Sequence, residues 1–158
     1  NVIMNKKQKS LTNKGFSLVE LIIVIAIMAV LVGVLAPQYI KYLDKSKISA
    51  DKQLADNLRQ AITTTMLDPD IDHTSSLAGG DIPDTADTFW KEVYGIMGVT
   101  NGDALEDALK YEKGAAITYS VSSTDSDVTV TVTYADTKKA ANSFKVDKAG
   151  ASTLTATP

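Results

Sequence analysis

The sequence contains no cysteine, although it is 158 residues long. Disulfide bonds are therefore excluded, and cysteine usage gives no indication of the redox compartment. A small domain without disulfides must be stabilised by packing and hydrogen bonds alone, or by neighbouring molecules in an assembly.

Residues that serve in active sites are also few. His73 is the only histidine, and nothing in the sequence indicates partners for it in a Ser-His-Asp triad. The segment from Asp68 to Asp72 opens like a calcium loop, but an EF-hand needs glycine where His73 stands and glutamate where Gly79 stands. No phosphate-binding, dinucleotide-binding or zinc-ligand spacing occurs either. We therefore predict that the chain is not an enzyme and that it binds neither a metal ion nor a cofactor.

Positive charge is scarce in the second half of the chain. After residue 67 there are 7 basic and 15 acidic side chains. Residues 1–15, by contrast, hold four lysines and no acid, and without them the chain has 12 basic and 19 acidic residues, a formal net charge of −7. Contacts with nucleic-acid phosphates require Lys and Arg, so we expect no nucleic-acid partner. The acidic surface suits a solvent-facing domain that stays soluble.

Charge is almost missing between Phe16 and Pro37. These 22 residues contain no Lys, Arg, Asp or Asn, and Glu20 is their one charged side chain. As an α-helix the segment would be about 33 Å long, which is enough to cross the hydrocarbon core of a bilayer. The sequence therefore predicts a basic leader over residues 1–15 and a hydrophobic, membrane-length helix over residues 16–37.

Three ordinary kinds of segment are alternative explanations for this apolar run. A secretory signal peptide has a shorter apolar region, about 7–15 residues, followed by small residues at its cleavage site, and the run here ends in Ala36-Pro37-Gln38. The core helix of a soluble protein is not expected to be apolar over such a length. A single-pass membrane anchor fits the length, and the leader lysines would keep its N-terminus in the cytoplasm. The anchor is therefore the main alternative.

Glu20 argues against a plain anchor. An acidic side chain within a bilayer costs about 2.5–3.5 kcal/mol, and such residues are usually functional. A cut before Phe16 would create a positive α-amine about 6 Å of helix rise from Glu20. Between two staggered helices, Glu20 of one copy could face the Phe16 amine of the next, and a wrong register would leave a buried charge unpaired. The pair would thus fix the register of assembled helices.

The segment KGFSLVELIIVIAIMAVLVGVLAP resembles the N-terminal signature of type IV pilins and their pseudopilin relatives. That pattern is a basic leader ending in glycine, then phenylalanine, then glutamate four positions later inside a hydrophobic helix. Here those residues are Gly15, Phe16 and Glu20. Pro37 matches a proline common in the major pilins of the family. Many members close a C-terminal loop with a disulfide, so the lack of cysteine resembles Gram-positive pilins instead.

The resemblance implies a series of steps and a set of partners. A prepilin peptidase would cut Gly15–Phe16 at the cytoplasmic face, and the new Phe16 amine would be N-methylated. Glu20 would guide the subunit, at the pilus assembly platform, into a homopolymeric helical filament. In the assembled filament, the helix would lose regular structure between Gly33 and Pro37. Before assembly the chain would cross the cytoplasmic membrane once with its N-terminus inside, and afterwards it would lie in an extracellular pilus.

Residues 38–67 are expected to continue the helix with an amphipathic period. Pro37 removes one backbone donor, and because the pattern resumes at once we expect a kink rather than an end of the helix. Apolar residues recur at three- and four-residue steps, at Ile40, Leu43, Leu54, Leu58, Ala61 and Ile62, then Thr65 or Met66.

Residues 68–158 are expected to form a globular α/β head. The stretch 68–88, with two prolines and six aspartates, is predicted to be loop. Helices are predicted over 89–97, with Trp90, Val93, Tyr94 and Met97 on one face, and over 104–112, after a turn at 100–103.

From Ile117 the apolar period changes to two, which indicates strands. We predict a hairpin over 117–121 and 128–134 with a threonine-rich wet face, a third strand near Phe144 and Val146, and a fourth over 151–157. The expected fold class is α+β, a long N-terminal helix packed against a small antiparallel sheet.

The leading functional hypothesis is a structural subunit of a type IV pilus, used for adhesion, motility or biofilm formation. A pseudopilin of a type II secretion or competence system shares the same N-terminal pattern and is the first alternative. A single-pass membrane-anchored binding domain is the second alternative, and it differs in keeping its leader uncut.

Overall fold

The computed structural model describes residues 15–74, 78–85, 87–135 and 143–154. The chain divides into two compact units, Asn1–Lys41 and Tyr42–Pro158. The elements in chain order are α1 (Leu18–Met66), β1 (Gly80–Asp81), α2 (Thr88–Met97), α3 (Gly102–Glu106), β2 (Ala116–Val121), β3 (Val128–Thr133), β4 (Ser143–Asp147) and β5 (Gly150–Leu154). The predicted α+β class is confirmed.

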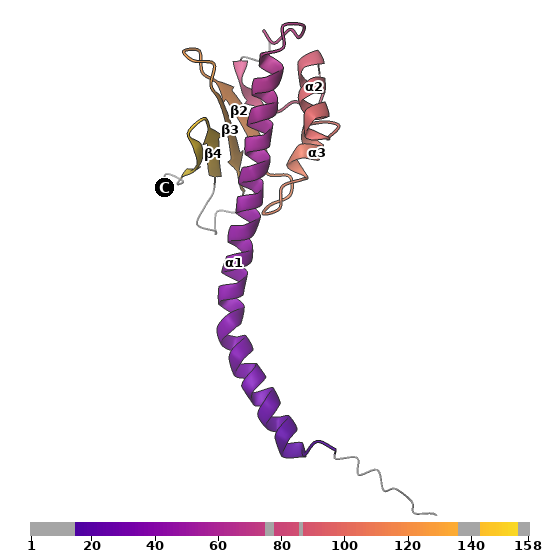
Figure 1. Cartoon of the computed structure of the whole chain (residues 1–158), viewed down its shortest axis with the longest axis vertical. Helices are drawn as coiled ribbons and strands as arrows, with labels where there is room; N and C mark the ends of the chain where they lie inside the picture. Colours follow the sequence, from indigo (N-terminus) through magenta and orange to yellow (C-terminus); the bar gives the residue numbers. More distant parts are fainter. Residues whose placement is uncertain (1–14, 75–77, 86, 136–142, 155–158) are drawn as a thin grey trace, which may run out of the picture. The chain divides into compact units, whose positions relative to one another are not determined.

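Helix α1 runs without interruption from Leu18 to Met66, with Pro37 inside it (Figure 1). The prediction that the helix does not end at the proline is confirmed, because proline loses one hydrogen bond there while the flanking residues keep theirs. The helix begins two residues after the predicted start. Ser17 precedes its first turn and accepts a hydrogen bond from the backbone of Leu21 at 3.1 Å.

The part of α1 that belongs to the second unit buries one face. The buried positions recur at three- and four-residue steps; they are Asp51, Ala55, Leu58, Ala61, Ile62 and Thr65. Ile40 and Leu43 continue the apolar period towards the N-terminus, but their side chains are 59% and 37% exposed and do not belong to this buried face. The buried face begins only at Asp51, where the head starts to cover the helix.

The five strands form one antiparallel sheet in the order β1-β2-β3-β4-β5. Strands β2 and β3 pair over six residues, from Ala116↔Thr133 to Val121↔Val128, which confirms the predicted hairpin. Valines of β3 are buried and alternate with threonines that are half-buried or exposed, as a sheet with one covered face requires. In Figure 1 the sheet lies to one side of the second half of α1, and α2 and α3 lie to the other.

Helix α2 confirms the predicted short helix and carries aromatic residues into the core. Asp87 caps it, accepting a hydrogen bond from the backbone of Trp90 at 2.9 Å, and Gly98 ends it with a φ of 70°. The ring of Trp90 meets the ring of Tyr119 at 5.0 Å between centroids. Trp90 and Tyr94 are thus core residues, whereas Met97 is only half-buried.

Three details of the head differ from the prediction. Helix α3 starts at Gly102, inside the predicted turn, because the Asn101 side chain accepts from the backbone of Ala104 at 2.9 Å. The short strand β1 lies within the predicted loop 68–88 and pairs with β2. Strand β5 confirms the start of the predicted fourth strand, whose residues 155–157 lie outside the described part of the chain.

A buried carboxylate connects α1 to the rest of the head. Asp51 is 1% exposed. It accepts hydrogen bonds from the backbone of Lys110 at 2.6 Å, from the backbone of Tyr111 at 3.0 Å and from the Tyr134 hydroxyl at 2.7 Å. Burial, together with this nearby carboxylate, raises the pKa of the Tyr134 hydroxyl above its ordinary value. The sequence pattern placed Asp51 among the polar positions of the helix.

Candidate functional site

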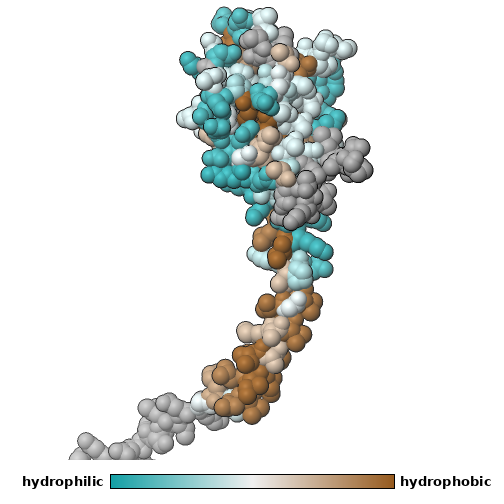
Figure 2. Space-filling model, turned by 180° about the vertical axis from the view of Figure 1, so that it is seen from behind, coloured by the Kyte–Doolittle hydropathy of each residue, from teal (hydrophilic) through white to brown (hydrophobic). Residues whose placement is uncertain are grey.

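In the first unit, every described residue from Gly15 to Lys41 is exposed. The large apolar side chains of the span 16–35 are between 48% and 90% exposed. Figure 2 shows them as a hydrophobic surface along this part of the helix. By length and composition, α1 is apolar enough to cross a membrane. An apolar surface of this extent marks contact with lipid or with other proteins.

Glu20 is the one charged side chain between Lys14 and Lys41. Its Oε2 atom accepts a hydrogen bond from the backbone N–H of Ser17 at 3.1 Å. Ser17 stands at the start of the helix and Glu20 three residues later, which is the arrangement of a capping box. The contact satisfies one of the donors that a helix start leaves unpaired. The Ser-x-x-Glu spacing signals this cap in the sequence, but the cap was not among the predicted features.

The predicted processing residues lie together at this helix start. Gly15 and Phe16 precede the helix, and a Cβ atom added to Gly15 would meet no atom within 4 Å. Phe16 is 90% exposed. Phe16, Glu20, Leu21 and Val24 line an open hollow of about 270 Å³. The Glu20 carboxylate therefore stands at the wall of an apolar recess, one helical turn from the bond that we expect to be cut.

Gly33 and Pro37 lie farther along α1 and do not contribute to that hollow. The helix is continuous through both residues. A Cβ atom added to Gly33 would meet no atom within 4 Å, so packing within this chain does not require glycine there. A loss of regular structure at these positions stays a prediction about the assembled state.

The acidic loop after α1 shows only local contacts. Two hydrogen bonds from Thr74, one from its hydroxyl and one from its backbone, lower the pKa of the exposed Asp72 carboxyl. The His73 ring lies 3.2 Å from the carbonyl oxygen of Ile71. Among the residues that the structure describes, no group of three or more His, Cys, Asp or Glu side chains could hold a metal ion. The N-terminal segment of α1 is therefore the strongest candidate for a functional site.

Comparison with known proteins matches the same segment. The family described as "Prokaryotic N-terminal methylation motif" matches residues 11–36. A type IV major fimbrial protein FimA of Dichelobacter nodosus is 43% identical over 55 residues, which is 35% of each chain. A fimbrial protein of Moraxella nonliquefaciens is 43% identical over 51 residues, 32% of this chain and 33% of that one. A further FimA of D. nodosus is 36% identical over 73 residues, 43% of this chain and 46% of that one. No solved structure gives a significant match.

The matches span only about a third to just under half of the length of these curated relatives. The methylation motif and the fimbrial relatives show that the N-terminal segment of the chain is similar to that of type IV fimbrial proteins. The long helix with its antiparallel sheet gives the chain an α+β architecture.

Proposed function

We propose that this chain is the structural subunit of a type IV pilus and not an enzyme. A prepilin peptidase cuts it between Gly15 and Phe16, the new amine is N-methylated, and the segment 16–37 polymerises with other copies into a surface filament. One observation carries the proposal. The segment 16–37 exposes a continuous apolar surface whose single charge, Glu20, lies one turn from the expected cut.

The charge pair is the step that sets the register. The Phe16 amine is positive at neutral pH. At about 4 Å two unit charges attract by about 1 kcal/mol in water and about 4 kcal/mol at the effective dielectric constant near a protein surface. A carboxylate has two oxygens, so Glu20 can keep its contact with Ser17 through one oxygen and accept from a neighbour's amine through the other. A helix in the wrong register leaves both charges unpaired, which is strongly unfavourable in an apolar bundle.

The same helix serves two environments in this proposal. Before assembly the segment 16–37 crosses the cytoplasmic membrane with its N-terminus inside, and the lysines of the leader favour that orientation. After assembly, neighbouring copies replace the lipid around the apolar surface. The acidic head faces solvent in both states. Adhesion, motility and biofilm formation are the roles that we propose for the filament.

The first experiment isolates surface filaments and determines the N-terminus of the subunit. We expect a chain that begins at methylated Phe16. A functional surface protein that retains the leader would instead be a membrane-anchored binding domain. A processed chain that forms no long surface fibres, and lies in short assemblies of the cell envelope, would be a pseudopilin.

The second experiment separates charge pairing from helix capping at Glu20. Glu20→Gln keeps an oxygen that can accept from the Ser17 backbone but removes the charge, whereas Glu20→Ala removes both. We expect both variants to insert into the membrane normally and both to lose most filament yield. Filament yield at the wild-type level in Glu20→Gln would contradict the register argument and assign Glu20 a capping role only.

A further inference from the structure

The two edges of the sheet are protected to different degrees. At one edge, β1 has only two residues, its Asp81 is exposed, and Pro83 stands two residues after it. At the other edge, β5 pairs over five residues with β4, from Asp147↔Gly150 to Ser143↔Leu154. The β5 strand contains neither a charge nor a proline. Short strands, charges and prolines are the features that prevent edge strands from pairing with other chains, and β5 lacks all three.

The outer side of β5 offers backbone groups for pairing. Among the described residues, β4 is the only strand that pairs with β5. In an antiparallel strand, alternate residues direct their N–H and C=O groups to opposite sides, so part of the β5 backbone faces away from the sheet. Ala151 and Ser152 are exposed, and their small side chains leave this edge accessible.

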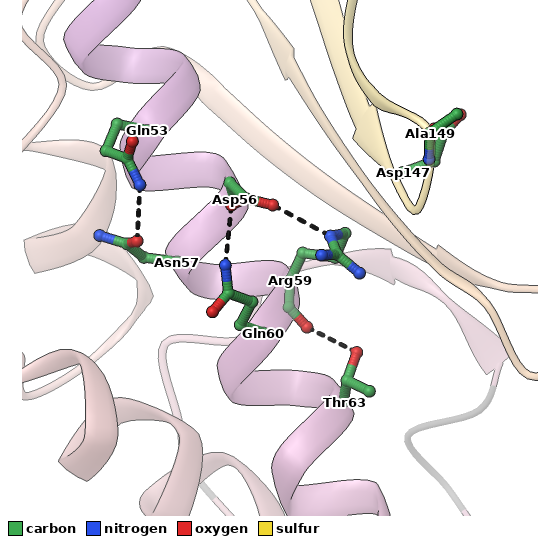
Figure 3. A network of polar contacts seen from close by, with 8 residues as sticks. All are labelled: Gln53, Asp56, Asn57, Arg59, Gln60, Thr63, Asp147 and Ala149. Atoms are coloured by element: carbon green, nitrogen blue, oxygen red, sulfur yellow. Dashed lines mark hydrogen bonds and ion pairs between the residues drawn. The ribbon is translucent and has the colours of Figure 1, made fainter.

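A groove runs beside this edge, between β5 and α1. Its volume is about 260 Å³, and its walls include Lys52 and Asp56 of α1 and Val146 and Ala151 of the sheet. Figure 3 shows this stretch of α1, where the Asp56 carboxylate accepts hydrogen bonds from the side chains of Arg59 and Gln60. The same view includes the β4–β5 turn at Asp147 and Ala149. The groove therefore lies next to β5, the strand that pairs on one side only among the described residues.

We propose that β5 of one copy pairs with β5 of a second copy in an antiparallel, two-fold contact. Centring the pair on Ser152 brings all five residues of each strand into register, with Gly150 opposite Leu154. No like charges meet, because β5 carries no charge. A β1 strand could supply only two pairs and would bring Asp81 into the contact. The α1 wall of the groove carries one charge of each sign, Lys52 and Asp56, and the lining residues of the sheet carry none, so the groove has no net charge that would repel a second copy.

The contact has a defined consequence for filaments, and this part rests on the proposed function. A two-fold contact uses the same patch on both subunits. Subunits of one polar filament all point the same way, so a two-fold contact joins subunits of different filaments and bundles them side by side. A single five-residue pairing buries much less than the roughly 1,600 Å² of a typical stable interface. Repetition along two filaments converts a weak contact into a strong one.

A cross-linking experiment on the full-length chain in detergent tests the pairing without requiring filaments. Because the sequence has no cysteine, Ser152→Cys introduces a unique thiol at the centre of the proposed pair. Directly opposite residues of an antiparallel pair have Cβ atoms about 4.5–5.5 Å apart, close to what a disulfide requires. Asp81→Cys, exposed at the opposite edge, is the matched control. We expect several-fold more disulfide-linked dimer from Ser152→Cys, and equal yields would overturn the proposal.

A charge experiment tests the consequence in filaments. Ser152→Glu places an acid beside Lys145, its partner on β4, so the fold is kept, but two such acids face each other across the two-fold contact. Ser120→Glu introduces the same exposed charge on β2, which is separated from β5 by β3 and β4. In electron micrographs we expect single filaments from Ser152→Glu and bundles from wild type and Ser120→Glu. Unchanged bundling of Ser152→Glu filaments would overturn the proposed β5–β5 pairing. A wild-type chain that forms no filaments would refute the proposed function instead. In that case the cross-linking experiment alone would decide whether β5 pairs with β5.

Discussion

Among single residues, Asp51 holds together parts of the head that are distant in sequence. Its three donors come from positions 59, 60 and 83 residues away. A buried carboxylate needs such donors, because an ionised group without hydrogen bonds is very costly inside a protein. Asp51 therefore joins α1 to the segment after α3 and to the end of β3. The cost of burial makes this arrangement sensitive to any change of the side chain.

We predict that Asp51→Asn lowers the free energy of unfolding of the head by about 1–3 kcal/mol, the range for leaving buried polar groups unsatisfied. An amide has one acceptor oxygen, and its NH₂ group would face donors. Urea unfolding followed by the fluorescence of Trp90, the single tryptophan, measures the loss. Asp56→Asn is the control. Asp56 is half-buried, and its partners Arg59 and Gln60 lie on the same helix, so we expect less than about 1 kcal/mol. Equal losses in the two variants would contradict a special role for Asp51.

At the scale of elements, a periodic sequence pattern was sufficient for prediction. The apolar run that opens α1, and the alternating valines and threonines of β3, repeat often enough to indicate one structure each. Strand β1 has two residues and therefore no period. Its existence follows from pairing with Tyr119 and Thr118, which lie far away in the sequence. Short elements of this kind depend on tertiary contacts that a local pattern does not contain.

Capping signals were present in the sequence and would have improved two boundaries. Asn101 starts α3 at Gly102 instead of Ala104, and Ser17 with Glu20 explains why α1 begins at Leu18. Gly15, Phe16 and Glu20 can be proposed as site residues from the sequence because the motif that contains them is local and short. The role of Asp51 was not predictable, since the same residue on the exposed face of a helix would look identical in the sequence.

Helix α2 offers a test of one such cap. We predict that Asp87→Ala lowers the stability of the head by about 1 kcal/mol, within the range of about 0.5–2 kcal/mol for loss of an N-cap side chain. The reason is that the backbone N–H of Trp90 loses its acceptor. Thermal unfolding monitored by circular dichroism measures the effect. Glu92→Ala removes an exposed acid from the same helix without touching the cap, and a loss as large as that of Asp87→Ala would assign the effect to charge and not to capping.

At the scale of the whole molecule, the two units differ in what stabilises them. Every buried residue in the described part of the chain lies between Asp51 and Val146, inside the second unit. The described residues of the first unit are all exposed, so they add nothing to a core within one chain. The exposed apolar surface of the first unit therefore indicates contact with lipid or with other proteins, whereas the second unit holds its own core of helix, sheet and short helices.

We predict that a fragment comprising Tyr42–Pro158 folds cooperatively without membrane or detergent. Its unfolding free energy should agree within about 0.5 kcal/mol with that of the head of the full-length chain in detergent, because every described residue of the first unit is exposed and adds nothing to a core. The fragment has 11 basic and 18 acidic residues, a formal net charge of −7, which favours solubility. Urea unfolding of both proteins, followed by Trp90 fluorescence, makes the comparison. A fragment that unfolds without a cooperative transition would show that the apolar helix contributes to the head, and the separation into an assembly unit and a self-sufficient head would then be wrong.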